Sequence, residues 1–175
     1  MKKFLLAATF AIIAATIVPA QGANGLEPIL PEGCEDLQPS AENQAVARVF
    51  ASGVQVYMWN GTSWAFVAPI ATLYSNDNAS AEFGTHFVGP TWRSRSGSLV
   101  VGKNPVRCTP DENSIPWLLL EADHTEGSGI FANASYIQRV NTSGGKAPSN
   151  PGFFLGEEAR IPYTTEYVFY RPTGR

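Results

Sequence analysis

The sequence predicts an all-β fold, a single-domain antiparallel β-sandwich or barrel with long loops. Apolar and polar residues alternate along most of the chain, at the period of two that is typical of half-buried strands. No segment beyond the N-terminal region keeps an apolar pattern at the helical period of 3.6. Sixteen Gly and thirteen Pro residues interrupt the apolar runs, as is expected of many short strands. These features predict one domain of about nine or ten strands.

The N-terminus has the features of a secretory signal peptide. Two lysines precede an apolar run at residues 4–18, and small residues follow it. The run is shorter than the ~20 residues of a transmembrane helix. We therefore expect residues 1–23 to be a cleaved signal peptide, 24–44 an N-terminal arm and 45–175 the β domain. The mature chain would be secreted, extracellular or periplasmic in a Gram-negative bacterium, with no membrane span.

The second and third expected strands form a hairpin. Residues 54–59 alternate with a period of two, and Asn60-Gly61 offers a tight turn in which both residues can adopt a positive φ. Residues 102–114 and 141–152 are expected to be loops. In chain order the expected strands are residues 46–50, 54–59, 64–67, 70–74, 82–88, 91–95, 98–101, 115–122, 130–140 and 162–170.

The later strands are bounded by Gly, Pro and Ser. Gly89-Pro90 ends or bends the strand at 82–88, because proline has no N–H for a ladder hydrogen bond. Ser96-Gly97 turns the next hairpin, and Gly127-Ser-Gly129 precedes a later strand. The apolar run at 115–122 is long enough for a buried strand and short for a helix.

The chain has two cysteines, Cys34 and Cys108. Two thiols in a secreted chain usually pair, and neither has a second Cys or a His within four residues as a metal site would require. We therefore expect a disulfide, which would stabilise the fold by roughly 4 kcal/mol in the chain-entropy model.

Composition also bears on partners and modification. The formal net charge is −3, and the basic residues are scattered, which argues against a nucleic-acid partner. Four Asn-x-Ser/Thr sequons are candidate glycosylation sites in a eukaryotic source and accidental matches in a bacterial one. They begin at Asn60, Asn78, Asn133 and Asn141.

Several blocks of sequence are distinctive when taken together. The most specific is Gly84-Thr-His-Phe-Val-Gly-Pro-Thr-Trp92, and others are Ile115-Pro-Trp-Leu-Leu-Leu120 and the closing aromatic segment at 161–170. In this order they resemble the secreted family numbered 3455 among the domains of unknown function. The resemblance covers nearly the whole mature chain and implies no established activity. Some fungal relatives carry a malate dehydrogenase label.

The dehydrogenase label depends on a dinucleotide-binding loop. Gly127-Ser-Gly-Ile-Phe-Ala132 fits the glycine pattern, but a helix must follow it, with an acidic residue about twenty positions on. Residues 130–140 read as a strand instead, and 145–154 contain no acid. We therefore reject the label and predict no cofactor.

The two histidines are the candidate residues for catalysis or metal binding. His86 and His124 with one acidic residue could make a metal site only if the fold joined two distant segments. The candidate acids, also considered as a carboxylate pair for glycoside hydrolysis, are Glu82, Glu121 and Asp123. No Gly-x-Ser-x-Gly elbow is present. A small hydrolytic or metal-dependent enzyme centred on His86 is therefore the alternative hypothesis, and no catalytic or metal residue is assigned.

The aromatic content favours a binding protein without catalysis. Four Trp, ten Phe and six Tyr are many for a small domain, and they either pack the core or form a surface on which a sugar or another apolar ligand stacks. We predict a carbohydrate or cell-surface ligand, with a structural coat or matrix protein as a further alternative. The predicted ligand-binding residues are His86, Trp92, Arg93, Trp117, Gln138 and Arg139.

Overall fold

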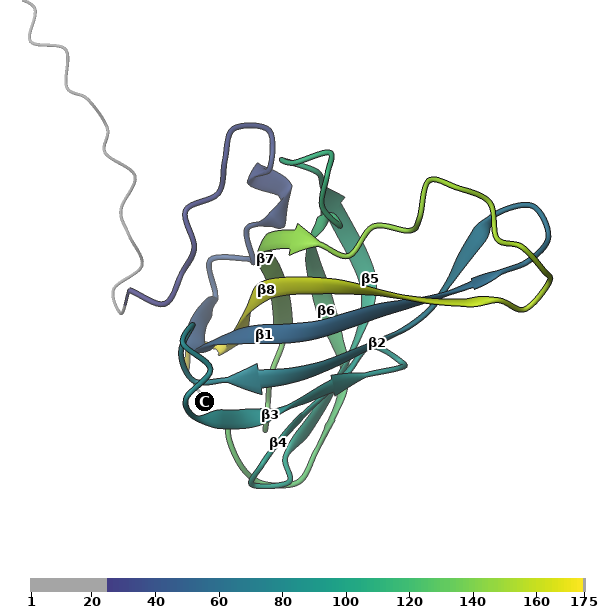
Figure 1. Cartoon of the computed structure of the whole chain (residues 1–175). Helices are drawn as coiled ribbons and strands as arrows, with labels where there is room; N and C mark the ends of the chain where they lie inside the picture. The colour runs from purple at the N-terminus through teal and green to yellow at the C-terminus, as the bar shows by residue number, and fades with distance from the viewer. Residues whose placement is uncertain (1–24, 175) are drawn as a thin grey trace, which may run out of the picture.

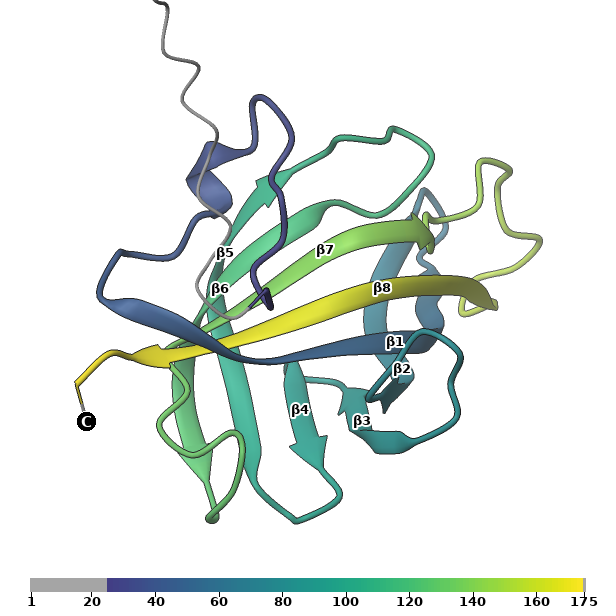
Figure 2. The ribbon, with the colours of Figure 1, turned by 90° about the vertical axis from the view of Figure 1, so that its left-hand side faces the viewer.

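Eight strands, each hydrogen-bonded to its neighbours in the sequence, close into an antiparallel barrel in the computed structural model, which describes residues 25–174 (Figure 1 and Figure 2). The strands are β1 (Asn43–Trp59), β2 (Trp64–Tyr74), β3 (Glu82–Phe87), β4 (Thr91–Ser94), β5 (Leu99–Cys108), β6 (Trp117–Glu126), β7 (Tyr136–Gly144) and β8 (Glu158–Pro172). Pairing of β8 with β1 closes the ring. The predicted all-β class is confirmed. The expected signal peptide lies outside the described residues.

The strands are fewer than predicted, and β1, β2, β5, β6 and β8 are longer. β1 continues through Gly53, where a break between two strands was expected. The residue is a glycine because β2 passes too close there for a side chain. A Cβ at this position would lie 2.1 Å from the backbone oxygen of Ile70. Pro69 does not break β2 either, and it is paired with Gln55. A glycine and a proline thus lie inside continuous strands.

Two further boundaries differ from the prediction. β5 continues to Cys108 across most of the expected loop at 102–114, with bulges that let it stay paired with β6. Residues 130–135 form turns rather than the start of a strand, since the amides of Ala132 and Ala134 donate to carbonyls three residues back. These turns bring Phe131, which is fully buried, against the core.

The β1–β2 turn also departs from the expected dipeptide. Only Gly61 has a positive φ, of 92°. Asn60 instead accepts hydrogen bonds at its side-chain oxygen from the amides of Thr62 (2.9 Å) and Ser63 (2.8 Å). The side chain therefore organises a four-residue loop, as Asn commonly does in turns.

The largest buried apolar cluster of the barrel lies towards one end. Buried apolar side chains from the whole ring pack there, among them Val49, Leu73, Phe131, Ile137 and Phe169. The β6–β7 loop contributes Phe131 and Ala134 to this cluster. The opposite end carries the projecting β1–β2 hairpin and the loop at 145–157, which lie together on one side in Figure 1.

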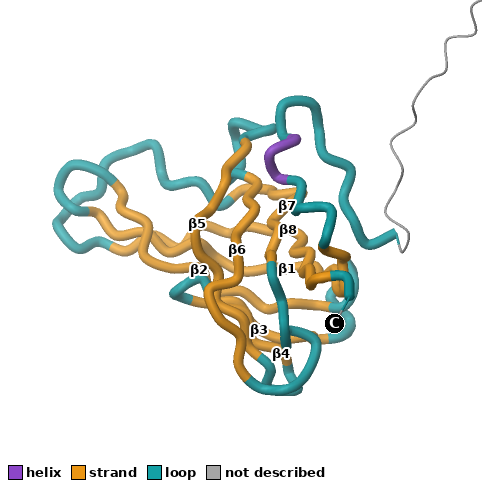
Figure 3. The backbone as a smooth tube through the Cα atoms, turned by 180° about the vertical axis from the view of Figure 1, so that it is seen from behind, coloured by secondary structure: helices purple, strands orange, loops and turns teal. Residues whose placement is uncertain are grey.

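The N-terminal arm packs outside the barrel. Its 3-10 helix, η1 (Glu35–Leu37), lies near β7 in Figure 3. The predicted disulfide is confirmed: Cys34 is bonded to Cys108 at the end of β5, with a Cα–Cα distance of 5.5 Å. Leu37 beside it is fully buried. The bridge thus fixes the arm against the outer surface of the sheet.

Two surface properties complete the description. The asparagines of all four sequons (Asn60, Asn78, Asn133 and Asn141) are exposed. Within residues 25–174, no helix has the length and apolar character required to cross a membrane.

Candidate ligand-binding cavity

A cavity of about 450 Å³ lies next to the largest buried apolar cluster of the barrel. It extends from buried residues such as Leu120 to Phe66 and Val67 at the rim, which are 55% and 45% exposed. Its walls are mainly apolar. The residues that line it include Gln55, Val67, His86, Trp92, Arg139 and Tyr167.

His86 and Trp92 form one wall. They are paired across β3 and β4 and face the interior, with ring centroids 4.3 Å apart and planes inclined by 10°. The Nδ1 of His86 lies 2.9 Å from the carbonyl oxygen of Thr91. Because a carbonyl only accepts, Nδ1 carries the proton and Nε2 is left as an acceptor. Burial lowers the pKa of His86 to about 3, so the ring is neutral at physiological pH.

Arg139 brings a positive charge to the cavity from β7. Its Nε and Nη2 donate to the carbonyl oxygen of Pro116, at 3.0 and 2.7 Å. No carboxylate among the described residues forms an ion pair with it. The charge acts on the surrounding groups: burial raises the pKa of Tyr167, and Arg139 opposes that rise.

Four buried polar atoms have no hydrogen-bond partner among the described residues. They are Gln55 Nε2, Trp92 Nε1, Tyr163 Oη and Tyr167 Oη. All four side chains are at most 2% exposed. Gln55, Trp92 and Tyr167 line the cavity. Burial raises the pKa of Tyr163, and its neighbour Tyr167 adds to the rise. The unpartnered groups therefore form one buried cluster beside the cavity.

The charged residues of the lining are all basic. Lys103, Arg107 and Arg139 contribute to it, and no Asp or Glu within residues 25–174 does. Lys103 is paired with Asp123 at 3.2 Å, and both side chains are nearly half exposed. The cavity is therefore positive although the whole chain has a formal net charge of −3.

The structure divides the predicted ligand-binding residues into two groups. His86, Trp92 and Arg139 line the cavity. Arg93 is exposed on β4, with its guanidinium 5.5 Å from the ring centroid of Phe87. It is therefore separate from the cavity.

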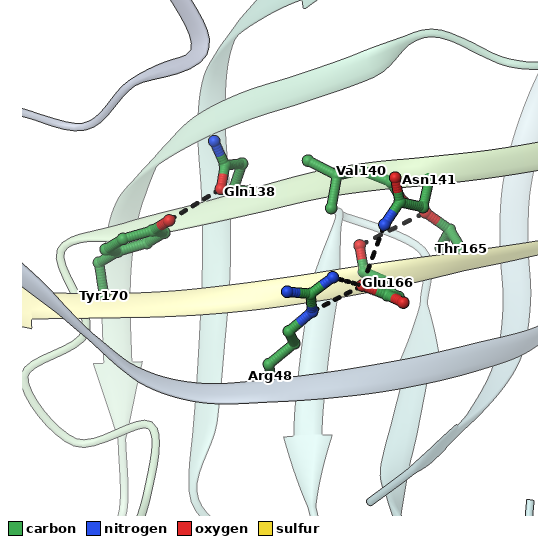
Figure 4. Close-up of polar contacts among 7 residues, drawn as sticks. All are labelled: Arg48, Gln138, Val140, Asn141, Thr165, Glu166 and Tyr170. Carbon is green, nitrogen blue, oxygen red and sulfur yellow. Dashed lines mark hydrogen bonds and ion pairs between the residues drawn. The ribbon is translucent and has the colours of Figure 1, made fainter. Parts of the chain in front are cut away.

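Trp117 and Gln138 also lie away from the cavity. Trp117 packs beside the disulfide, against Leu37. Gln138 is fully buried beneath the arm, where its amide donates to Leu37 O (2.8 Å) and accepts from the hydroxyl of Tyr170 (2.8 Å) (Figure 4). Both hydrogen-bonding ends of this amide are occupied.

The two histidines are not brought together. His86 is 3% exposed inside the barrel. The side chain of His124 is half exposed, with Nδ1 at 3.1 Å from Asp123 and Nε2 at 3.5 Å from Glu126. In residues 25–174 no group of three His, Cys, Asp or Glu side chains is placed to hold a metal ion.

Sequence reasoning missed three of the unpartnered residues: Gln55, Tyr163 and Tyr167. A signal for Gln55 was present, because it follows Ala51 and Gly53 at every second position of one strand and so shares their inward face. A polar residue at an inward position is the feature that marks an internal site.

Comparison with known proteins gives a family without a described activity. The model of the family described as "Protein of unknown function (DUF3455)" matches residues 39–171, which include all eight strands except the end of the last. No curated protein and no solved structure matches the chain. The chain therefore belongs to the DUF3455 family, whose sequence match spans the barrel and the cavity inside it.

Proposed function

We propose that this protein is an exported binding protein that holds a small, mainly apolar molecule inside the barrel. The observation that carries the proposal is the incompletely filled interior: the main core packs towards one end, and a cavity of about 450 Å³ lies next to it, with core residues such as Trp92 and Leu120 in its wall. Eight-stranded barrels can hold one small ligand. Mainly apolar walls with a few placed polar groups are typical of small-molecule sites.

Binding without catalysis is better supported than an enzyme centred on His86. A general base works best with a pKa near the operating pH, whereas burial lowers the pKa of His86 to about 3. Its ring is also held by the Trp92 stack and by Thr91. These contacts make His86 a neutral wall residue.

An apolar ligand in the cavity is better supported than a sugar stacked on Trp92. The indole is 1% exposed, one face is covered by the ring of His86, and Tyr167 meets it edge-on with centroids 5.2 Å apart. A sugar would need an open aromatic face. Cell-envelope material remains a suitable source of the apolar ligand.

Export is supported by the disulfide between Cys34 and Cys108, since such bonds persist in oxidising compartments. The test is to express the full chain and sequence the N-terminus of the exported protein. We expect cleavage after Ala20 or Ala23. Retention of the leader in a cytoplasmic protein would refute export.

Binding in the cavity is tested with the neutral fluorescent dye N-phenyl-1-naphthylamine. Val67→Trp narrows the rim of the cavity and should weaken binding by about tenfold, a change of 1.4 kcal/mol. Val106→Trp is the matched control, because Val106 has nearly the same exposure (41% against 45%) and does not line the cavity. Sugars that compete with the dye would indicate a carbohydrate ligand instead. No dye binding, or equal loss in both variants, would refute the proposal.

A further inference from the structure

We infer that the ligand of this cavity is an amphipathic monoanion, a carboxylic acid or a related oxyanion, whose charged end is held at Arg139. The inference rests on the proposed function and adds the chemical class of the ligand. It follows from three features of the cavity: the pairing of Arg139, the hydrogen-bonding character of the unpartnered atoms, and the charges of the lining.

Arg139 has no ion-pair partner among the described residues. The side chain is partly buried, and its two known hydrogen bonds go to one neutral oxygen, that of Pro116. Arginines removed from water normally pair with carboxylates or phosphates, often through two parallel N–H donors. In contrast, Arg48 on the outer surface of β1 is paired with Glu166 (Figure 4). Arg139 is thus a cation at a cavity without an anionic partner from residues 25–174.

The second step concerns the unpartnered atoms. The side-chain nitrogens of Gln55 and Trp92 can only donate, and the hydroxyls of Tyr163 and Tyr167 are free to donate. Tyr167 lies near enough to Arg139, Tyr163 and Trp92 for each to affect its pKa. Donor groups gathered beside a cation favour an oxyanion nearby, because a carboxylate has acceptor sites only.

The third step concerns the balance of charge. Three basic residues and no acidic residue line the cavity of a chain with a formal net charge of −3. A cleft lined by one sign of charge raises the local concentration of the opposite ion. The apolar remainder of the wall, which includes Leu118 and Ile115, provides contact for a hydrophobic tail. An amphipathic anion satisfies both parts of the cavity.

The test compares two dyes that differ by a single group. The anion 1-anilinonaphthalene-8-sulfonate is N-phenyl-1-naphthylamine with one added sulfonate. We expect the anionic dye to bind at least about tenfold more tightly, as hydrogen bonds to charged groups allow. Decanoate should displace it at concentrations at which decanol does not. Equal binding of the two dyes, or equal competition by decanol, would overturn the inference.

Substitutions of Arg139 test whether the charged end of the ligand binds there. Arg139→Met should remove the preference for the anionic dye, so that the two dyes bind with similar affinity, and Arg139→Lys should retain part of the preference. Arg93→Gln, which removes an exposed charge from β4, should change neither affinity. Should Arg139→Met not fold, Tyr167→Phe serves instead and should weaken only the anionic dye, by about threefold to tenfold.

The outcomes separate the two proposals. Absence of binding by both dyes would overturn the proposed function. Neutral-dye binding that Val67→Trp weakens, without any anionic preference, would overturn the ligand class alone. A preference that survives Arg139→Met unchanged would overturn the role of Arg139.

Discussion

Replacing Tyr167 by Phe should stabilise the protein without ligand, because the hydroxyl that is removed has no well-formed hydrogen bond to any group within residues 25–174. Its oxygen is buried, and the residue is 1% exposed. An unsatisfied buried hydroxyl costs about 1–3 kcal/mol, while loss of one atom leaves only a small void. A net gain of about 1 kcal/mol is expected, which raises Tm by roughly 2–4 °C for a domain of this size.

Tyr170→Phe is the matched control. Tyr170 is equally buried at 1% exposed, but its hydroxyl donates to the amide oxygen of Gln138 at 2.8 Å. The same substitution there leaves that oxygen unpaired and should destabilise the protein by about 1–2 kcal/mol. Urea unfolding and differential scanning calorimetry measure both variants. Equal destabilisation by the two substitutions would show that the Tyr167 hydroxyl is satisfied in the folded protein, and the reasoning would be refuted.

Three further predictions concern other parts of the fold. The pKa of His86 is lowered from 6.5 to about 3, so the unfolded chain binds more protons between these values. Stability should therefore be full above pH 6.5 and fall below it by up to ~1.4 kcal/mol per unit. His86→Gln should flatten the profile between pH 6.5 and 4.5 in urea unfolding, and the exposed control His124→Gln should not; identical slopes in both would contradict the assignment. Replacing Cys34 and Cys108 by Ser should cost about 4 kcal/mol and make the arm sensitive to limited proteolysis, and an arm as resistant as before would show that packing alone holds it. Gly53→Ala places a Cβ at 2.1 Å from a backbone oxygen of β2 and should destabilise by about 1–3 kcal/mol, whereas unchanged urea unfolding would mean that the two strands separate freely.

The sequence predicted the fold class because the alternation is strong, but Gly53 and Pro69 were misread as strand ends. Each lies inside a strand for a reason that depends on the neighbouring strand. The space beside Gly53 is taken by the backbone of β2, and Pro69 is paired opposite Gln55. Strand neighbours are long-range information that local punctuation does not contain.

The period of two also bears on why only three of the six predicted ligand-binding residues line the cavity. Successive side chains of a strand point to opposite faces. Trp92 and Arg93 are adjacent, as are Gln138 and Arg139, so neither pair can line one cavity. Proposing both members of each pair conflicted with the strand pattern itself. Which member faces inward is set by register, and the pairing of Trp92 with His86 determines it here.

The location of the unpartnered groups argues against a purely structural role for the barrel. The packed end of the interior shows how the chain fills space when stability alone matters, with side chains such as Val49, Leu73 and Phe169. Beside the cavity, the hydroxyls of Tyr163 and Tyr167 have no hydrogen-bond partner among the described residues, at a cost of about 1–3 kcal/mol for each group. Apolar residues of similar size would relieve this, as Tyr167→Phe is expected to do. Groups that destabilise a fold and cluster at one cavity are explained when a ligand supplies their partners. The stability lost without the ligand is then recovered on binding, as linkage requires of any molecule that binds only the folded state.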